Sequence, residues 1–310
     1  MTSRILITGA AGLIGTATRM AFENSDWEVK TLDIRRRDLD RRSIDYVCDI
    51  LTIEKTEEIL SNVDGIVHLA AVSRVIDAEF NQELCTRTNI EGTIRVLQAA
   101  SAAGCSWFIF ASSREVYGEQ VSFPVNEEGR IDPINHYGRA KVLGEKIVRQ
   151  HCNSNGMSQS ILRFSNVYGH PADSSSRIVN AFIREALSGG NLEIHGGEQI
   201  FDLVHVNDVV SVIVKAAKQL QSTRSHLPVM NVSTGIPTSI EKLTDIISEK
   251  TGEKIVTRHL PGNEFSVNHF CGDPTRMKEV LGFRCSLDLS TGIELAVEAQ
   301  RNLRDECQEG

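Results

Sequence analysis

Tyr137 and Lys141 are the two residues whose types and spacing point most directly to chemistry. They stand four positions apart in a segment with a helical pattern, so their side chains are expected on one face of a helix. A lysine in that place holds positive charge near the phenol, which favours the phenolate and lowers the tyrosine pKa. A tyrosine tuned in this way can transfer a proton to or from a hydroxyl group. Such a pair is common on helix surfaces, so its position in the fold decides its meaning.

A glycine-rich turn close to the N-terminus supplies a second chemical signal. The run from Ile5 to Gly15 reads as a strand, a turn and the start of a helix, with glycines spaced GxxGxxG. Glycine permits positive φ and lets the backbone approach a pyrophosphate, while a helix N-terminus offers unpaired N–H groups and a positive dipole end. The turn therefore predicts a dinucleotide site formed by Gly9, Gly12, Leu13, Ile14 and Gly15.

Asp33 bears on the choice between the two nicotinamide cofactors. It ends the second expected strand, 18 residues after Gly15. An acid at that point accepts hydrogen bonds from the adenosine ribose and repels a 2′-phosphate, which favours NAD over NADP. The following run Arg35–Arg37 weakens the argument, because these side chains are able to neutralise such a phosphate, so NADP stays open.

The elements that position these residues alternate between short apolar runs and helical patterns. Expected strands are Ile5–Thr8, Glu28–Asp33, Gly65–Ala70, Phe108–Ser112 and Ser160–Arg163, and expected helices are 12–24, 53–61, 88–103 and 137–153. Strands that alternate with helices in this way indicate a parallel sheet covered on both faces. The predicted fold class is therefore α/β, a Rossmann-like doubly wound parallel sheet.

The pattern changes after Tyr168, where residues 169–176 have the composition of a loop. Shorter units follow: helices near 178–188, 207–220, 239–251 and 290–303, and strands near 191–195 and 229–232. We therefore expect residues 1–168 to form a cofactor-binding domain that carries the catalytic residues. Residues 169–310 are expected to form a smaller α/β substrate lobe that shares the cleft.

Composition excludes some classes of function and points to a compartment. The net charge of −8 disfavours a nucleic-acid or anionic-membrane binder, since both need a basic face. The seven cysteines are scattered without a CxxC pair, as reduced thiols of a cytosolic protein are, and no metal-ligand cluster is visible. No apolar stretch approaches the roughly 18 residues of a membrane span. Because the first strand begins by Ile5, no signal peptide is expected, and the predicted location is the cytoplasm.

Taken in order, the motifs resemble those of the extended short-chain dehydrogenase/reductase family, in its sugar-nucleotide epimerase and dehydratase branch. The resemblance covers nearly the whole chain. It rests on Thr8–Gly15, Asp49-Ile50, His68-Leu69-Ala70-Ala71, Asn89 with Gly92-Thr93, Ser112–Gly118, Tyr137 with Lys141, Arg163–Gly169 and Asp202–Val209.

The resemblance implies roles for individual residues. Ser113 would hydrogen-bond the reacting hydroxyl, Tyr137 would be the acid/base, and Lys141 would hold the nicotinamide ribose and tune Tyr137. Further cofactor contacts are implied for Asp49 and Ile50 at the adenine, and for Leu69, Ala70, Ala71 and Asn89. Substrate contacts are implied for Arg74, Ser113, Arg114, Asn166, Arg177 and Asn180. Ser113 also follows an expected parallel strand, and ligand sites of open α/β sheets lie at such carboxyl ends.

Glu115 has two readings. In the dehydratases of the family a glutamate at this point removes a sugar C5 proton, often with an aspartate before it, whereas here Arg114 precedes it. A glutamate beside arginine is kept ionised, as a base must be. Its alternative role is a hydrogen bond that shapes the loop.

Two positions depart from the family pattern. Relatives usually carry a diphosphate-binding arginine where this chain has Phe201, and another where it has Leu260. Neither side chain replaces the forked, permanently charged donors of arginine. Arg74, which would face the sugar, suggests an acid group or a different sugar. Other bases that compensate for the missing arginines are to be sought among Arg177, Arg184, Arg258, His259 and His269.

The sequence thus predicts an NAD-dependent sugar-nucleotide epimerase that transiently oxidises a sugar carbon, expected to be C4, and reduces it from the other face. Alternatives are a 4,6-dehydratase that uses Glu115, an NAD-dependent dehydrogenase of a free sugar or uronic acid, and a non-catalytic NAD-binding subunit. The expected partner is a sugar or nucleotide sugar, with no nucleic acid, membrane or metal. A homodimer is expected through the helices at 88–103 and 137–153.

Overall fold

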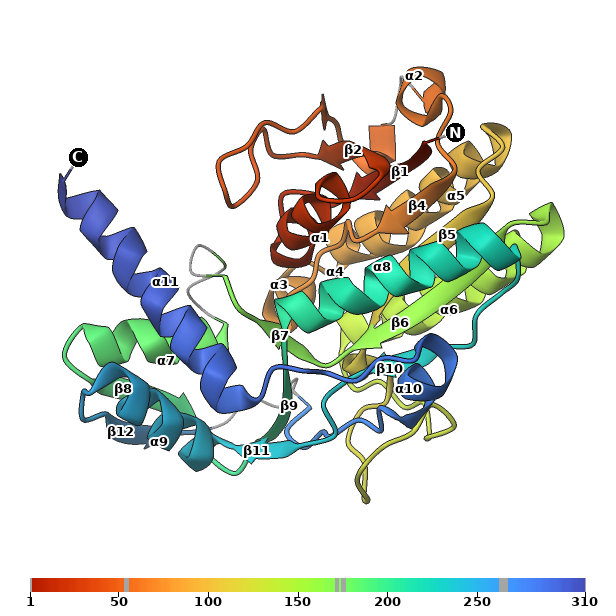
Figure 1. Cartoon of the computed structure of the whole chain (residues 1–310). Coiled ribbons are helices and arrows are strands. Elements are labelled where there is room, and N and C mark those ends of the chain that lie inside the picture. Colours follow the sequence, from red (N-terminus) through yellow and green to blue (C-terminus); the bar gives the residue numbers. More distant parts are fainter. Residues whose placement is uncertain (1, 53–55, 171–172, 174–176, 262–266, 310) are drawn as a thin grey trace.

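The computed structural model describes residues 2–52, 56–170, 173, 177–261 and 267–309 (Figure 1). Its centre is a seven-stranded sheet in the order β10-β6-β5-β4-β1-β2-β3, with every neighbouring pair parallel. The strands are β1 (Ser3–Thr8), β2 (Trp27–Asp33), β3 (Tyr46–Val47), β4 (Gly65–His68), β5 (Trp107–Ser113), β6 (Ser158–Phe164) and β10 (Met230–Val232). The predicted Rossmann-like α/β class is confirmed.

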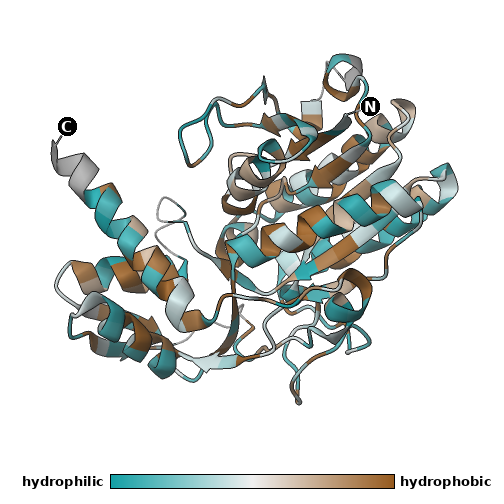
Figure 2. Cartoon of the chain, in the orientation of Figure 1, coloured by the Kyte–Doolittle hydropathy of each residue, from teal (hydrophilic) through white to brown (hydrophobic). Residues whose placement is uncertain are grey.

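Helices cover both faces of this large sheet. On one face α1 (Leu13–Glu23) lies against α8 (Val206–Thr223), with α10 (Thr275–Leu281) in the same apolar cluster. On the other face lie α2 (Thr56–Leu60), α5 (Thr93–Ala102) and α6 (His136–Asn155). Alternate residues of the strands enter the two cores: Ile5 and Ile7 join the first, and Leu6 joins the second. The period of two thus explains why the strands are apolar throughout, and Figure 2 shows the hydrophobic strands between mixed helices.

A smaller lobe packs around its own apolar cluster. Its helices are α7 (Ile178–Leu187), α9 (Ile240–Thr251) and α11 (Leu289–Glu309), and its paired strands are β8 (Asn191–His195) and β12 (Val256–Leu260). A three-stranded sheet connects it to the rest, in the order β11 (Pro237–Ser239), β9 (Ile200–His205), β7 (Asn166–Tyr168). Figure 1 shows this lobe beside the large sheet, with α11 running along its outer side.

After residue 168 the chain returns to the large sheet: α8 packs on one face of the sheet, and β10 extends the sheet at one edge. The division of the chain at residue 168 stays a prediction and has to allow for this return.

The expected strands and long helices occur within a few residues of their predicted places. The expected helix 88–103 begins as a π-helical turn, η2 (Arg87–Gly92), and the expected strand Gly65–Ala70 ends at His68. Residues 53–55 of the expected helix 53–61 lie outside the described residues.

Several short elements have no counterpart in the sequence prediction. They are η1 (Ile50–Thr52), α3 (Val75–Phe80), α4 (Gln82–Thr86), η3 (Arg114–Val116), α10, and the strands β3, β7, β9, β11 and β12. Most have three to seven residues, too few for a clear period of 2 or 3.6. Their pairing depends on distant partners, as when β9 joins β7 and β11.

His68, the last residue of β4, connects the sheet to a covering helix. Its Nδ1 lies 2.7 Å from Thr8 Oγ1, and its Nε2 lies 3.0 Å from Thr93 Oγ1. The ring is fully buried, and this burial, together with the charge of Lys141, lowers the His68 pKa to about 3. The folded protein therefore holds His68 neutral, whereas the unfolded chain protonates it near its ordinary pKa of about 6.5.

We predict that His68 makes stability depend on pH in the acid range. Between about pH 6.5 and 3 the unfolded chain binds a proton that the folded chain does not, so the free energy of unfolding falls as the pH falls. His68→Gln removes the titrating group and should flatten the dependence over that window. Urea titrations of both proteins at several pH values measure it. Parallel pH profiles for the two proteins would show that another group is responsible.

Candidate active site

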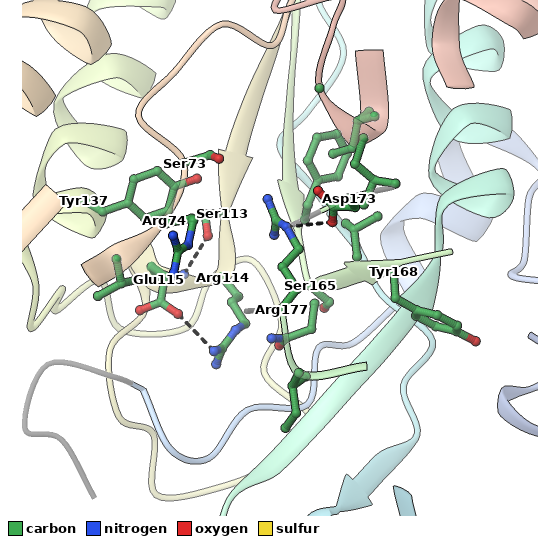
Figure 3. A pocket seen from close by; sticks show the side chains of 18 of the residues that line it. Ser73, Arg74, Ser113, Arg114, Glu115, Tyr137, Ser165, Tyr168, Asp173 and Arg177 are labelled. Carbon is green, nitrogen blue, oxygen red and sulfur yellow. Dashed lines mark hydrogen bonds and ion pairs between the residues drawn. The ribbon is translucent and has the colours of Figure 1, made fainter. Parts of the chain in front are cut away.

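A pocket of about 750 Å³ lies between the glycine turn, the carboxyl end of β5 and the smaller lobe (Figure 3). It brings together residues from far apart in the sequence. The lining residues include Gly9, Gly12, Gly15, Arg35, Arg74, Ser113, Arg114, Glu115, Tyr137, Lys141, Ser165, Asn166, Arg177, Asn180 and Phe201. In the part of the chain that the structure describes, no group of three or more His, Cys, Asp or Glu is placed to hold a metal ion.

The glycine turn forms a cradle that has no room for side chains at two of its three glycines. Gly9 has φ +69°, and a Cβ there would lie 2.6 Å from the Ala70 backbone nitrogen. A Cβ on Gly15 would lie 2.2 Å from the Gly9 carbonyl oxygen. Gly12 differs, because its nearest neighbours would be 3.4 and 3.8 Å away and it faces the pocket. This close-packed turn at the N-terminus of α1 fits a pyrophosphate approaching over Gly12.

The Asp33 carboxylate stabilises the glycine turn by accepting backbone hydrogen bonds. Its Oδ2 accepts a hydrogen bond from the Ala11 N–H at 3.0 Å, and its Oδ1 accepts one from the Arg35 N–H at 2.9 Å. The carboxylate is 6% exposed and does not line the pocket, whereas Arg35 does. The Arg35 guanidinium pairs with Asp33 at 3.4 Å. The ribose contact predicted for Asp33 therefore stays a prediction.

The other residues expected at the cofactor divide into two groups. Leu69 and Ala71 line the pocket, and the Ala70 N–H donates to Thr8 Oγ1 at 3.3 Å. Asn89 does not line it and instead exchanges hydrogen bonds with the Val72 backbone at 2.8 and 3.0 Å, which fastens the segment after β4. Asp49 accepts from the Leu51 N–H at 2.9 Å, Ile50 is buried, and neither lines the pocket.

Helix α6 carries Tyr137 and Lys141 into the pocket from its first turns. The side chain of Asn135 caps the helix by accepting from the Gly138 N–H at 2.7 Å. The Tyr137 phenol lies beside Ser113, which ends β5, and Ser113 favours the ionised form of the phenol. Figure 3 shows Tyr137 and Ser113 facing the same space. The structure thus brings together the three residues expected to act on a hydroxyl group.

Burial dominates the electrostatics of both α6 residues. It raises the pKa of Tyr137 above its ordinary value, against the opposing effect of Ser113. It lowers the pKa of Lys141 to about 8, although the charge of Glu145 counteracts this. The Lys141 ammonium donates to the Ala111 carbonyl at 2.6 Å and lies 5.6 Å from the Tyr137 ring centroid. The expected lowering of the Tyr137 pKa is therefore wrong for the protein alone, because burial outweighs the neighbouring groups that favour the phenolate.

Both oxygens of Glu115 are engaged. Oε2 accepts from the Asn135 side-chain amide at 2.6 Å, and Oε1 pairs with Arg114 Nη2 at 3.0 Å. Arg114 also donates to the Val267 carbonyl at 3.3 Å. The carboxylate therefore holds the start of α6 and the segment at Val267 in place. This arrangement favours the loop-shaping reading of Glu115 over the base.

Glu145 is a positioning residue that the sequence analysis missed. It lies one turn beyond Lys141 on α6, is 4% exposed, and accepts from the Ser112 hydroxyl at 2.6 Å. Arg163 of β6 binds it with two hydrogen bonds of 2.8 Å. The spacing Tyr137, Lys141, Glu145 repeats every four residues, so the shared helix face was the available signal. Glu145 thus fastens α6 next to Ser113.

The expected substrate residues gather at the far side of the catalytic group. Arg74 and Arg177 line the pocket, each next to an acid of its own segment: Asp77 at 3.3 Å and Asp173 at 2.8 Å. Asn166 Oδ1 and the neighbouring Ser165 hydroxyl are buried and have no hydrogen-bond partner among the residues that the structure describes. Asn180 donates to the His170 carbonyl at 2.9 Å. Ser165 was missed because its hydroxyl is recognisable only once its surroundings are known.

Of the two positions that depart from the family pattern, one lines the pocket and the other does not. Phe201 lines the pocket and is 9% exposed, whereas Leu260 does not line it. Of the bases expected to compensate, Arg177 lines the pocket. Arg184, Arg258, His259 and His269 do not.

The glycine cradle and the group of Ser113, Tyr137 and Lys141 match the arrangement expected of an enzyme that moves a proton and a hydride at a hydroxyl-bearing carbon. A family model described as the NAD dependent epimerase/dehydratase family matches residues 5–232. The chain belongs to this family, and it is an NAD-dependent enzyme.

Two solved structures and one curated relative illustrate the similarity. The UDP-glucose 4-epimerase of Thermotoga maritima, solved with UDP-glucose, is 30% identical, with 97% of this chain and 99% of that chain covered and a TM-score of 0.89. MoeE5, in complex with UDP-glucuronic acid and NAD, is 28% identical, with 97% and 100% covered and a TM-score of 0.89. The UDP-glucose 4-epimerase of Mycolicibacterium smegmatis is 28% identical over an alignment of 317 positions, which covers 96% of this chain and 99% of the relative.

The glycine cradle gives a matched pair of variants. Gly12→Ala fits the fold but places a methyl group where the pyrophosphate is expected, so NAD affinity should fall roughly tenfold or more, about 1.4 kcal/mol, with the melting temperature retained. Gly9→Ala has no room and a positive φ, so it should lower the melting temperature as well. Calorimetric NAD titration and thermal unfolding separate the two effects. Undiminished NAD binding by Gly12→Ala would place the cofactor elsewhere.

Proposed function

We propose that this chain is an NAD-dependent sugar epimerase, which oxidises a hydroxyl-bearing carbon and reduces it again from the opposite face. The observation that carries the proposal is the meeting of Ser113, Tyr137 and Lys141 with the glycine cradle in one pocket. That pocket lies at the carboxyl end of β5, where open α/β sheets bind ligands. A protein that only bound the cofactor would not need this catalytic group.

The chain's own residues handle the proton. Bound NAD would supply a hydride acceptor and donor, and its oxidised form would add positive charge to the pocket. Tyr137 accepts the hydroxyl proton and later returns it, and Ser113 holds the reacting oxygen by a hydrogen bond. Lys141, held by the Ala111 carbonyl, adds positive charge that favours the phenolate over the neutral phenol.

The similar proteins support a position and a substrate for this reaction. Those described above are 4-epimerases by name or were solved with UDP-sugars. We therefore assign the reaction to C4 of a sugar, with nucleotide sugars as the first substrates to test. The engaged oxygens of Glu115 speak against the dehydratase alternative, which needs that carboxylate as a base.

A second candidate is an NAD-dependent dehydrogenase of a free sugar or uronic acid. Phe201, an apolar side chain in the substrate part of the pocket, favours it, because phenylalanine offers no donor to a diphosphate. An epimerase must also retain its oxidised sugar while the ring turns over. A substrate without a large anchored group leaves more easily once it is oxidised, which favours a dehydrogenase. A dehydrogenase accumulates NADH, whereas an epimerase does not.

We further propose that residues 1–168 form the cofactor-binding domain and that residues 169–310 form the substrate lobe, with the return of α8 and β10 to the large sheet noted above. We assign the enzyme to the cytoplasm, since the six cysteines whose side chains are described are free thiols. In the described helices, none is long and apolar enough to cross a membrane.

Tyr137→Phe should lower kcat by about 100- to 10,000-fold, because it removes the proton acceptor and keeps the ring. The purified protein is incubated with NAD and a panel of UDP-, GDP- and dTDP-sugars and free uronic acids. Absorbance at 340 nm and NMR of the products follow the reaction. Tyr46→Phe, on β3 away from the pocket, is the control and should keep wild-type activity. Full turnover by Tyr137→Phe would refute the mechanism.

We also propose a homodimer that includes the face of α6. Phe80 is 86% exposed, and Leu84 and Leu143 are also exposed, on α3, α4 and α6, which contact one another. A second copy of the chain would cover this apolar face. We expect light scattering to give a dimer for the wild type and a monomer for Phe80→Glu combined with Leu143→Glu. Val121→Glu, at an exposed apolar site elsewhere, should remain dimeric. A monomeric wild type at micromolar concentration would contradict the proposal.

A further inference from the structure

Positive charge is distributed unevenly along the substrate part of the pocket. The outer wall is formed by residues of β8, β9 and the segments next to them: His195, Gln199, Phe201, Leu203, Val267 and Asn268. None of these six residues is a lysine or an arginine. Among the residues that the structure describes, the outer wall therefore offers no permanent cation to an anionic ligand.

The polar groups of the outer wall are largely occupied within the protein. His195 Nδ1 lies 3.3 Å from the Pro261 carbonyl, so it donates there and leaves Nε2 as an acceptor in the neutral ring. The Gln199 side chain donates to the His195 carbonyl at 2.5 Å and accepts from the Gly197 N–H at 2.7 Å. Phe201 and Leu203 are apolar. A diphosphate placed here would lose its hydration without gaining charged donors.

The catalytic side of the pocket is rich in cations, which differ in how firmly they are held. Arg114 is buried against Glu115 at 3.0 Å, and Arg177 pairs with Asp173 at 2.8 Å. Arg74 pairs with Asp77 at 3.3 Å, and the two side chains are 37% and 52% exposed. An exposed pair of this kind contributes little to stability, because water screens the attraction between the two charges. Arg74 can therefore exchange Asp77 for an anionic ligand at little cost.

We propose that the pocket binds a sugar acid through Arg74, with the acid group on the sugar itself and no nucleoside diphosphate attached. The guanidinium of Arg74 binds the carboxylate, for which its forked donors are suited. Phe201 gives the outer wall an apolar side chain, which offers no donor to a diphosphate. This inference rests on the proposed function in taking the same pocket as the sugar site. It replaces the nucleotide sugar of the similar proteins by a smaller substrate.

The test measures binding independently of turnover. Wild-type protein saturated with NAD is titrated calorimetrically with UDP, with galacturonic and glucuronic acids, and with galactose and glucose. We expect no binding of UDP at 1 mM, a concentration chosen well above the micromolar range. We also expect each sugar acid to bind at least about tenfold more tightly than its neutral counterpart. Micromolar binding of UDP, or equal affinity for acids and neutral sugars, would overturn the inference.

Two pairs of variants locate the effect. Arg74→Gln should remove the preference for the acid, while Arg130→Gln, another exposed arginine that pairs with a nearby aspartate, should retain it. Phe201→Arg should create UDP binding, whereas Ile200→Arg on the same strand, outside the pocket, should not. Thermal unfolding checks that each variant folds. An acid preference that survives Arg74→Gln would contradict the role of Arg74.

The same titrations separate this inference from the proposed chemistry. Arg74-dependent binding of an acid without turnover of any sugar would uphold the inference and refute the epimerase and dehydrogenase proposals. Turnover of a UDP-sugar together with tight UDP binding would uphold the chemistry and refute the inference.

Discussion

The attachment of α6 to the carboxyl end of β5 is the constraint on which the site depends. Two hydrogen bonds make it: the Lys141 ammonium to the Ala111 carbonyl, and the Ser112 hydroxyl to Glu145. Arg163 of β6 neutralises Glu145, so that this buried carboxylate is not left unpaired. These contacts fix the rotation and depth of the helix, and therefore the places of Tyr137 and Ser113. The catalytic group is thus held by the core of the fold rather than by a mobile loop.

Burial gives the site its electrostatic character. Tyr137 and Lys141 lose hydration when the helix docks, which raises the pKa of the phenol and lowers that of the ammonium to about 8. The protein alone therefore keeps Tyr137 protonated, and additional positive charge is required before it accepts a proton readily. Linking proton transfer to an occupied site in this way prevents the phenol from ionising in the free enzyme.

The sequence predicted most of what repeats along the chain or lies within one segment. The parallel strands, the long helices and the glycine turn follow from apolar periodicity and from spacing, and the helix face shared by Tyr137 and Lys141 follows from their separation. What it missed depends on distant partners. Strand β9 becomes visible only through its pairing with β7 and β11, and Glu145 acquires meaning only through Ser112 and Arg163. The sequence predicted a lowered pKa for Tyr137, whereas burial raises it, and a YxxxK pattern does not show how deeply the tyrosine is buried.

The central claim is that hydrogen moves as a hydride at the carbon that bears the reacting hydroxyl, and its fate is directly measurable. NAD-loaded enzyme is mixed in ordinary water with a sugar substrate deuterated at every ring carbon, and NMR locates the label afterwards. The account predicts that deuterium at one ring carbon passes to the cofactor or returns to that carbon with inverted geometry, and that none reaches the solvent. Release of that deuterium into water would show proton abstraction instead and would contradict the account.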